Sequence, residues 1–138
     1  MKQALITGGA RGIGFGIAKA MLAAGYSVTV TGLTADEVAA VPEHGNLNAV
    51  PLDVTSDGDV ATCIARLSRL DALVNCAGMV LRDGKEFTIA GFQKVIDVNL
   101  TGTMRMCMAA KPLLDRSSGA IVNIASVWSF FGGPLVPA

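Results

Sequence analysis

Short apolar runs alternate with longer amphipathic stretches along this sequence. Residues 4–6 form an apolar run of the length of a buried strand, and apolar side chains then recur at helical spacing over residues 13–24. A β-branched strand is predicted over residues 27–31, with Gly25 ending the helix before it. Because the crossover between parallel strands is right-handed in nearly all proteins, these elements predict a βαβ unit with its two strands side by side.

The same alternation continues to the end of the sequence. Further strands are predicted over residues 48–52, 71–75 and 119–126. Helices are predicted to begin after Thr34 and after Ser56, because each is followed three residues later by an acidic residue, as in a capping box. A longer helix is predicted from about Thr88 to Ala109. Buried strands that alternate with helices predict a single α/β domain over residues 1–138, with a doubly wound parallel sheet.

Composition and charge argue against a membrane-spanning protein and against nucleic-acid partners. Hydrophobic residues make up 51% of the sequence and the mean hydropathy is +0.52, yet no uninterrupted apolar segment approaches the ~20 residues of a membrane helix. Fully buried strands explain this apolar surplus. Eleven basic residues balance eleven acidic ones without a basic cluster, so neither nucleic acid nor an anionic membrane is expected as a partner. Met1-Lys2-Gln3 runs straight into the first strand, which leaves no room for a signal peptide and predicts a cytoplasmic location.

The cysteines and the single histidine do not indicate a metal site. Cys63, Cys76 and Cys107 are odd in number and lack any CxxC or paired-ligand spacing, so they are expected to be small reduced core residues. His44 is the only histidine, which excludes a His-rich metal site, and its surroundings are typical of a loop. We therefore expect no metal and no catalytic role for His44.

A glycine-rich segment joins the first strand to the first helix. Residues 7–14 follow the pattern TGxxxGxG, whose spacing differs from the GxGxxG of the general dinucleotide fingerprint. In a strand-to-helix turn, glycines let the backbone approach a pyrophosphate, and the first N–H groups and the dipole of the helix point at the anion. Taken alone, such glycines are equally consistent with a tight turn and nothing more. The TGxxxGxG spacing resembles the cofactor signature of the classical short-chain dehydrogenase/reductase family.

This resemblance implies a Rossmann-type fold and an NADP or NAD site. In the resembled family the first five strands have the order 3-2-1-4-5, and further strands and helices follow that this sequence lacks. Among its members the sequence is similar to 3-oxoacyl reductases. The residues that match the family's cofactor-binding positions are Thr7, Gly8, Arg11, Gly12, Ile13, Gly14, Gly32, Asp53, Val54, Asn75, Ala77 and Gly78.

Position 32 bears on the choice between NADP and NAD. Dinucleotide folds that prefer NAD usually place Asp or Glu at the end of strand two, whereas this sequence has Gly32, so nothing is expected to repel a 2'-phosphate there. Arg11 lies where NADP-preferring members of the resembled family often carry a basic residue, although Leu33 stands where a second one is usual. Asp36 could reach the ribose, but its place in the first turn of a helix favours a helix-dipole role. The sequence therefore predicts NADP, with NAD as the alternative.

Two segments that follow later strands resemble further cofactor contacts of the family. Asp53-Val54 matches the adenine-side contact, and the alternative is an acidic residue in a turn before a helix cap. Asn75-Cys76-Ala77-Gly78 resembles the NNAG motif that lies along the cofactor, with Cys76 in place of the second Asn.

Two residues resemble catalytic positions of the family. Asn99 matches the helix Asn that supports a water-linked proton relay, and Ser126, at the end of strand five, matches the serine that hydrogen-bonds the substrate oxygen. The family's proton donor is a Tyr followed four residues later by Lys, but the only tyrosine here is Tyr26, before strand two. The sequence is therefore expected to be the cofactor-binding N-terminal part of such an enzyme, ending just before the catalytic Tyr, with the remaining polypeptide covering strand five.

The resemblance implies an NAD(P)-dependent oxidoreductase that interconverts a carbonyl and a secondary alcohol by hydride transfer. The alternative is a non-catalytic NAD(P)-binding or sensing module on the same fold, because fold alone does not give function. Candidate substrates are 3-oxoacyl thioesters, sugars and polyols, or small secondary alcohols, with the acyl class favoured. A homo-oligomer, in relatives often a tetramer, is expected to use the helix face around Thr103, Met104, Met106 and Met108, although methionines also fill ordinary cores.

Overall fold

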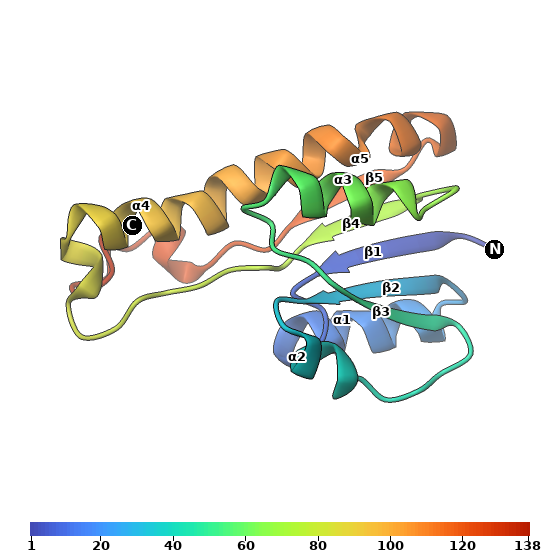
Figure 1. The fold of residues 1–138 in the computed structure, drawn as a ribbon, viewed down its shortest axis with the longest axis horizontal. Coiled ribbons are helices and arrows are strands. Elements are labelled where there is room, and N and C mark those ends of the chain that lie inside the picture. Colours follow the sequence, from blue (N-terminus) through green and yellow to red (C-terminus); the bar gives the residue numbers. More distant parts are fainter.

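The computed structural model describes residues 1–138 as a parallel sheet with helices on both faces (Figure 1). The five strands are β1 (Gln3–Thr7), β2 (Ser27–Gly32), β3 (Leu47–Pro51), β4 (Ala72–Asn75) and β5 (Ala120–Asn123). They lie in the order β3-β2-β1-β4-β5, and every neighbouring pair is parallel. The predicted order 3-2-1-4-5 is confirmed. All five carboxyl ends consequently lie at one edge of the sheet.

The helices follow the strands in the order that the sequence predicts. They are α1 (Gly12–Ala23), α2 (Ala35–Ala39), α3 (Asp57–Ala65), α4 (Ile89–Ile96) and α5 (Thr103–Ser117), with short 3-10 turns η1 (Lys85–Phe87) and η3 (Val127–Ser129) and a π-helical segment η2 (Asp97–Gly102). Thr34 and Ser56 are N-caps whose hydroxyl oxygens accept hydrogen bonds from the amides three residues later, as predicted.

The long helix predicted from Thr88 to Ala109 differs from the observed one in two ways. The π-helical η2 interrupts it, and α5 continues to Ser117 with Pro112 inside it. A π-helical turn holds one more residue than an α-helical turn, and apolar spacing does not reveal such a local change. The helix extends past Ala109 because Leu113 and Leu114 are buried in the core.

Strand five is shorter than predicted. The sequence predicts it over residues 119–126, whereas only Ala120–Asn123 form the strand, paired with Ala72–Asn75 of β4. Because β4 ends at Asn75, β5 loses its partner there, and the chain turns away before Ser126. The candidate catalytic serine is therefore the N-cap of η3 and not a strand residue.

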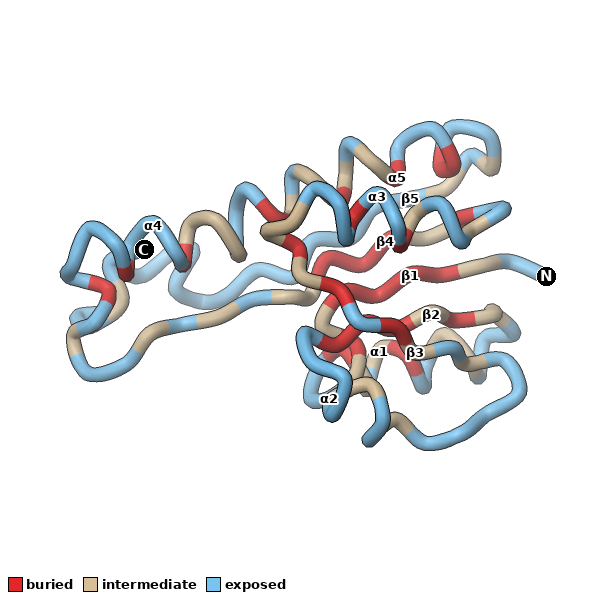
Figure 2. The backbone as a smooth tube through the Cα atoms, in the orientation of Figure 1, coloured by how far each residue is buried: buried red, intermediate tan, exposed pale blue.

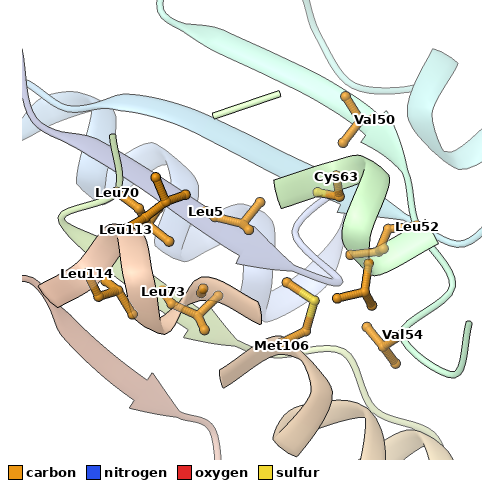
Figure 3. Packing of buried hydrophobic residues seen from close by; sticks show 12 residues of the cluster. Leu5, Val50, Leu52, Val54, Cys63, Leu70, Leu73, Met106, Leu113 and Leu114 are labelled. Atoms are coloured by element: carbon orange, nitrogen blue, oxygen red, sulfur yellow. The ribbon is translucent and has the colours of Figure 1, made fainter. Parts of the chain in front are cut away.

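Two hydrophobic clusters hold the helices on the sheet. On one face, Leu5 of β1 and Leu73 of β4 pack with Cys63 of α3 and Met106 of α5 in a cluster of 12 buried residues (Figure 3). On the other face, Ile6 and its neighbours in β2 and β4 pack against Ala18 of α1. Burial of each large aliphatic side chain contributes roughly 1.5–3 kcal/mol, so the strands are fixed from both sides.

The outer strand β5 is far more exposed than the inner strands of the sheet. Buried residues gather in β1, β2 and β4, whereas all four residues of β5 are exposed (Figure 2). Beyond the carboxyl edge, α4 and the C-terminal segment lie together and project from the body of the molecule (Figure 1). None of the helices combines the length and the apolar character that crossing a bilayer requires.

Candidate cofactor-binding and active site

The glycine-rich turn after β1 is packed backbone to backbone. A Cβ atom on Gly14 would lie 2.4 Å from the carbonyl oxygen of Gly8, and one on Gly8 would lie 2.9 Å from Cα of Ala77. Gly8 and Gly12 also have positive φ angles of 62° and 57°, a conformation that favours glycine. The turn therefore needs glycine at these positions, and it presents bare backbone at the carboxyl edge of the sheet.

Helix α1 begins inside this turn with an uncapped N-terminus. Its N-cap residue, Arg11, is extended and makes no side-chain cap, and the first turn contains no acidic residue. The first free backbone amides and the positive end of the helix dipole favour an anion at this point. Together with the close approach at Gly14, these features fit the pyrophosphate of a dinucleotide, and Gly12, Ile13 and Gly14 are the first residues of the helix.

Thr7 joins the glycine-rich turn to the end of β4. Its buried hydroxyl oxygen accepts hydrogen bonds from the amides of Cys76 and Ala77, each at 3.1 Å. On the other side, the Gly8 amide donates to Oγ1 of Thr31 in β2 at 3.2 Å. These hydrogen bonds connect the carboxyl ends of β2, β1 and β4, where the candidate cofactor-binding residues lie.

The space beside Gly32 contains a carboxylate that the sequence did not place there. Nε of Arg11 donates to Oε1 of Glu37 at 3.1 Å, and the Leu33 amide donates to Oε2 at 2.7 Å. A Cβ atom on Gly32 would lie 2.9 Å from Cβ of Glu37. The expectation that negative charge is missing at the end of β2 is therefore corrected, because Glu37 of α2 supplies it. Asp36, the acidic residue weighed from the sequence, lies exposed beside it in the first turn of α2.

Asp53 holds the turn between β3 and α3. Its Oδ1 atom accepts hydrogen bonds from the amide of Thr55 at 2.9 Å and from the Thr55 hydroxyl at 2.7 Å. Val54 is buried against Gly102, where a Cβ atom would lie only 2.6 Å from Cγ2 of the valine. Both residues follow β3 at the carboxyl edge, and their contacts match the local turn role. An adenine contact at Asp53 stays a prediction.

Asn75 ends β4 and is buried with an incomplete set of hydrogen bonds. Its Nδ2 atom donates to Oδ1 of Asn123 at 2.9 Å and to Sγ of Cys107 at 3.3 Å, while its Oδ1 atom has no partner. Asn75 and Asn123 are paired in the β4–β5 register, so the contact follows from the sheet. Cys76 beside it is a free thiol whose pKa burial raises, as burial also does for Cys63, so neither thiol is activated.

Asn99 lies in the π-helical η2 and binds the backbone that follows Gly78. Its Oδ1 atom accepts a hydrogen bond from the Met79 amide at 2.8 Å, and its Nδ2 atom donates to the Met79 carbonyl at 2.9 Å. The backbone carbonyl of Asn99 accepts from the Thr103 hydroxyl at 2.9 Å. The side chain therefore positions the segment after β4, and its part in a water-linked relay stays a prediction.

Ser126 and Tyr26 lie at opposite edges of the sheet. Ser126 follows β5 and is exposed beyond the carboxyl edge, where its Oγ atom accepts from the Trp128 amide at 3.3 Å. Tyr26 precedes β2 at the amino edge, with Nζ of Lys2 5.9 Å from the centre of its ring. The only tyrosine of the chain is thus remote from Ser126. No hydrogen bond links Ser126 to Asn99, whose side chain bonds only to Met79.

Sequence reasoning missed three contributors to this edge. Thr31 supports the glycine-rich turn, Asn123 is the partner of Asn75, and Glu37 pairs with Arg11. A signal existed for Asn123, because two asparagines at matching ends of neighbouring strands face each other. For Glu37, the capping pattern that begins at Thr34 predicted a carboxylate bonded to the backbone at the helix N-terminus. In the structure this carboxylate bonds to Leu33 and Arg11 instead.

Comparison with known proteins agrees with this geometry. A sequence model described as short chain dehydrogenase matches residues 2–138. The chain is 36% identical to 2-dehydro-3-deoxy-D-gluconate 5-dehydrogenase of Bacillus subtilis over 99% of its own length and 58% of that protein. It is 38% identical to 3-oxoacyl-[acyl-carrier-protein] reductase of Synechocystis sp. over 95% of its own length and 58% of that protein.

A solved structure extends the comparison to the fold. The active-site complex of Pseudomonas aeruginosa RhlG with NADP superposes with a TM-score of 0.84 at 30% identity, covering 99% of this chain and 59% of that one. The chain therefore spans somewhat more than half the length of the relatives it matches. Its sheet order, its glycine-rich turn and the match along nearly its whole length show that the chain belongs to the short chain dehydrogenase family.

Proposed function

We propose that the whole protein is an NADP-dependent oxidoreductase that interconverts a carbonyl and a secondary alcohol. The observation that carries this proposal is the backbone cradle of Gly8 and Gly14 at the uncapped N-terminus of α1, on the edge beyond which Ser126 lies. NADP is the cofactor in the RhlG complex, and Arg11 beside Gly32 offers a cation to a 2'-phosphate. NAD remains the second candidate.

Each part of this edge has a role in the proposal. The α1 N-terminus binds the pyrophosphate, and the segment of Asn75, Ala77 and Gly78 lies along the rest of the dinucleotide. The bound nicotinamide supplies or accepts the hydride. Ser126 Oγ donates a hydrogen bond to the substrate oxygen and fixes it for reaction, and Asn99 positions the segment after Gly78 and takes part in a proton relay.

The proton donor lies outside the residues described above. Tyr26 cannot reach the substrate oxygen beside Ser126, because it lies at the opposite edge of the sheet. We expect the family's Tyr and Lys in the part of the whole protein that this chain does not span, which is somewhat more than two fifths of the matched relatives. That part is also expected to cover β5. The cytoplasmic location expected from the sequence stays a prediction.

A 3-oxoacyl thioester is the first substrate class to test. The segment after Ser126 presents exposed apolar side chains, among them Val127, Trp128, Phe130 and Phe131. An apolar surface beside the candidate catalytic serine suits an acyl chain better than a sugar. The similar Synechocystis protein is a 3-oxoacyl reductase, whereas the similar Bacillus protein acts on a sugar acid, so sugars and polyols form the competing class.

A homo-oligomer is part of the same proposal. The outward face of α4, η2 and α5 exposes apolar residues along its length: Ile89, Phe92, Leu100, Met104 and Met108. Met106, on the inward side, is fully buried in the core and takes no part in this face. An exposed apolar stripe of this length favours contact with a second copy of the protein. A tetramer is the expected assembly.

Substitution of Ser126 tests the proposed chemistry. In the whole protein, Ser126→Ala is expected to lower kcat for NADPH-dependent reduction of a 3-oxoacyl thioester by roughly 10²-fold, because the substrate oxygen loses its fixed donor. The Kd for NADPH should stay unchanged, since the serine faces the substrate. NADPH oxidation followed by absorbance gives kcat, and fluorescence titration gives the Kd.

The matched control is Ser68→Ala. Ser68 is exposed and lies between α3 and β4, at the amino edge of the sheet, so its substitution should change neither kcat nor the Kd for NADPH. Unchanged turnover in Ser126→Ala would refute the role of the serine. Tight NADPH binding by the wild-type protein, without reduction of a 3-oxoacyl thioester or of a sugar carbonyl, would favour the non-catalytic binding or sensing module.

A further inference from the structure

The Glu37–Arg11 pair occupies the place where a dinucleotide fold reads the ribose. In such folds the residue at the end of strand two meets the 2' position of the adenosine ribose. Gly32 holds that position here and has no side chain, and the Glu37 carboxylate fills the space beside it. A Cβ atom on Gly32 would lie 3.3 Å from Oε2 of Glu37, so the carboxylate stands where a side chain of residue 32 would have placed one.

The two partners of this pair are held very differently. The Glu37 side chain is 29% exposed, and the Leu33 amide fixes one of its oxygens through a 2.7 Å hydrogen bond. Arg11 is 82% exposed and is fixed by Glu37 alone. An ion pair with one partner so exposed is weak, so the guanidinium is free to turn toward another anion. The carboxylate has no comparable freedom and remains beside Gly32.

Glu37 is charged at neutral pH. The Leu33 amide, and after it the Arg11 guanidinium, hold the pKa of Glu37 below its ordinary value. Two charged groups flank Glu37: Arg11 of the glycine-rich turn, which contacts its carboxylate, and Asp36, the preceding residue of α2, which does not. A fixed negative charge therefore faces any group bound at the end of β2.

We propose that Glu37 is the residue that determines how strongly the site discriminates NADP from NAD. Its carboxylate accepts the ribose 2'-hydroxyl of NAD, and it competes with the 2'-phosphate of NADP for Arg11. Arg11 turns to the phosphate when NADP binds, because a guanidinium pairs well with phosphate. Glu37 stays in place and repels the same phosphate, so the preference for NADP is smaller than Arg11 and Gly32 alone would give. This inference rests on the proposed cofactor site.

The test is a fluorescence titration of the whole protein with NADPH and with NADH. Glu37→Gln keeps an oxygen for the Leu33 amide and removes the charge. It should tighten NADPH binding on the order of 10-fold and weaken NADH binding by a few-fold, since a charged acceptor for the hydroxyl is lost. Arg11→Ala should act in the opposite sense, weakening NADPH binding on the order of 10-fold with little effect on NADH.

Asp36→Asn is the matched control, because it removes the same charge from the neighbouring residue, whose carboxylate contacts neither Arg11 nor Leu33. It should change the ratio of the two Kd values less than about 2-fold, in line with a screened surface charge. The proposal is overturned if the wild-type protein binds NADPH while Glu37→Gln leaves that ratio unchanged or shifts it no more than Asp36→Asn. Binding of neither dinucleotide by the wild-type protein instead overturns the proposed cofactor site, and this inference with it.

Discussion

Asn99 uses both atoms of its side-chain amide on a single backbone unit. It accepts from the amide of Met79 and donates to the carbonyl of the same residue, which fixes the segment after Gly78 against η2. Only an amide side chain offers a donor and an acceptor in this arrangement. The residue type at position 99 is thus explained by positioning of the backbone, whatever further part it takes in the chemistry.

Asn99→Asp tests this explanation. A carboxylate can still accept from the Met79 amide, but it cannot donate to the Met79 carbonyl and places negative charge beside it. We expect the free energy of unfolding of the whole protein to fall by about 1–2 kcal/mol, measured by urea denaturation. Asn48→Asp, at an exposed position of β3, should change it by less than about 0.5 kcal/mol. Equal effects of the two substitutions would show that the Met79 contacts do not stabilise the fold.

The sequence predicts candidate site residues but not the residues that they contact. Thr7 and Asn75 were predicted to bind the cofactor and Asn99 to support a proton relay. Their hydrogen bonds reach residues 20 or more positions away, so these contacts depend on how the strands are placed. Glu37 was attributed to helix capping because it lies three residues after Thr34. Its pairing with Arg11 was missed because the two residues are 26 positions apart in the sequence. Local patterns can name a residue with a special role, whereas a contact between distant segments appears only once the sheet is assembled.

At the scale of the elements, the sequence and the structure differ at the ends of helices and strands. The π-helical η2 separates α4 from α5 and contains Asn99, and Arg105 of α5 joins Asp97 of η2 to Asp57 of α3 through contacts of 2.8 and 2.9 Å. The spacing of apolar residues predicted the strands and one long helix where α4, η2 and α5 lie, but not the interruption by η2. It also placed the end of strand five too late, because the length of β4 decides where β5 stops.

The amino edge of the sheet depends on Asp71, which precedes β4. Its Oδ2 atom accepts from the Gln3 amide at 2.8 Å, and the Arg69 guanidinium binds both oxygens. Its side chain is only 7% exposed. The hydrogen bonds from Arg69, and after them the bond from the Gln3 amide, lower the pKa of Asp71 from its ordinary 3.8 to about 2. The carboxylate therefore stabilises the fold as long as it is ionised.

The pH dependence of stability follows from that shift. Because the pKa is lower in the folded state, the stabilisation is fully present above about pH 4 and is lost as the pH falls toward 2. Asp71→Asn should lower the free energy of unfolding by about 1–2 kcal/mol at pH 7, and the difference from wild type should shrink between pH 4 and pH 2. Asp115→Asn breaks the exposed pair with Lys111 and should cost less than about 0.5 kcal/mol. A difference for Asp71→Asn that is independent of pH contradicts this account.

At the scale of the whole molecule, a parallel sheet brings every candidate site residue to one edge. The order β3-β2-β1-β4-β5 places the glycine-rich turn at the centre of that edge, with Gly32 and Asp53 to one side and Asn75 and Ser126 to the other. This arrangement could be predicted, because alternating strands and helices with right-handed crossovers allow few topologies. The exposed β5 and the apolar face of α4 and α5 lie outside the two cores, and the remaining polypeptide and further copies of the protein are expected to cover them.

The measurement that tests the central claim most directly is a titration of the whole protein with NADPH, comparing wild type with Gly14→Ala and Gly16→Ala. The first substitution places a Cβ atom 2.4 Å from the Gly8 carbonyl oxygen and forces the turn apart, whereas a Cβ atom on Gly16, two residues further along α1, meets nothing within 4 Å. We predict saturable binding by wild type and by Gly16→Ala, and a loss of affinity on the order of 10-fold or more in Gly14→Ala. No binding by wild type, or equal binding by all three proteins, would contradict a dinucleotide site at this turn.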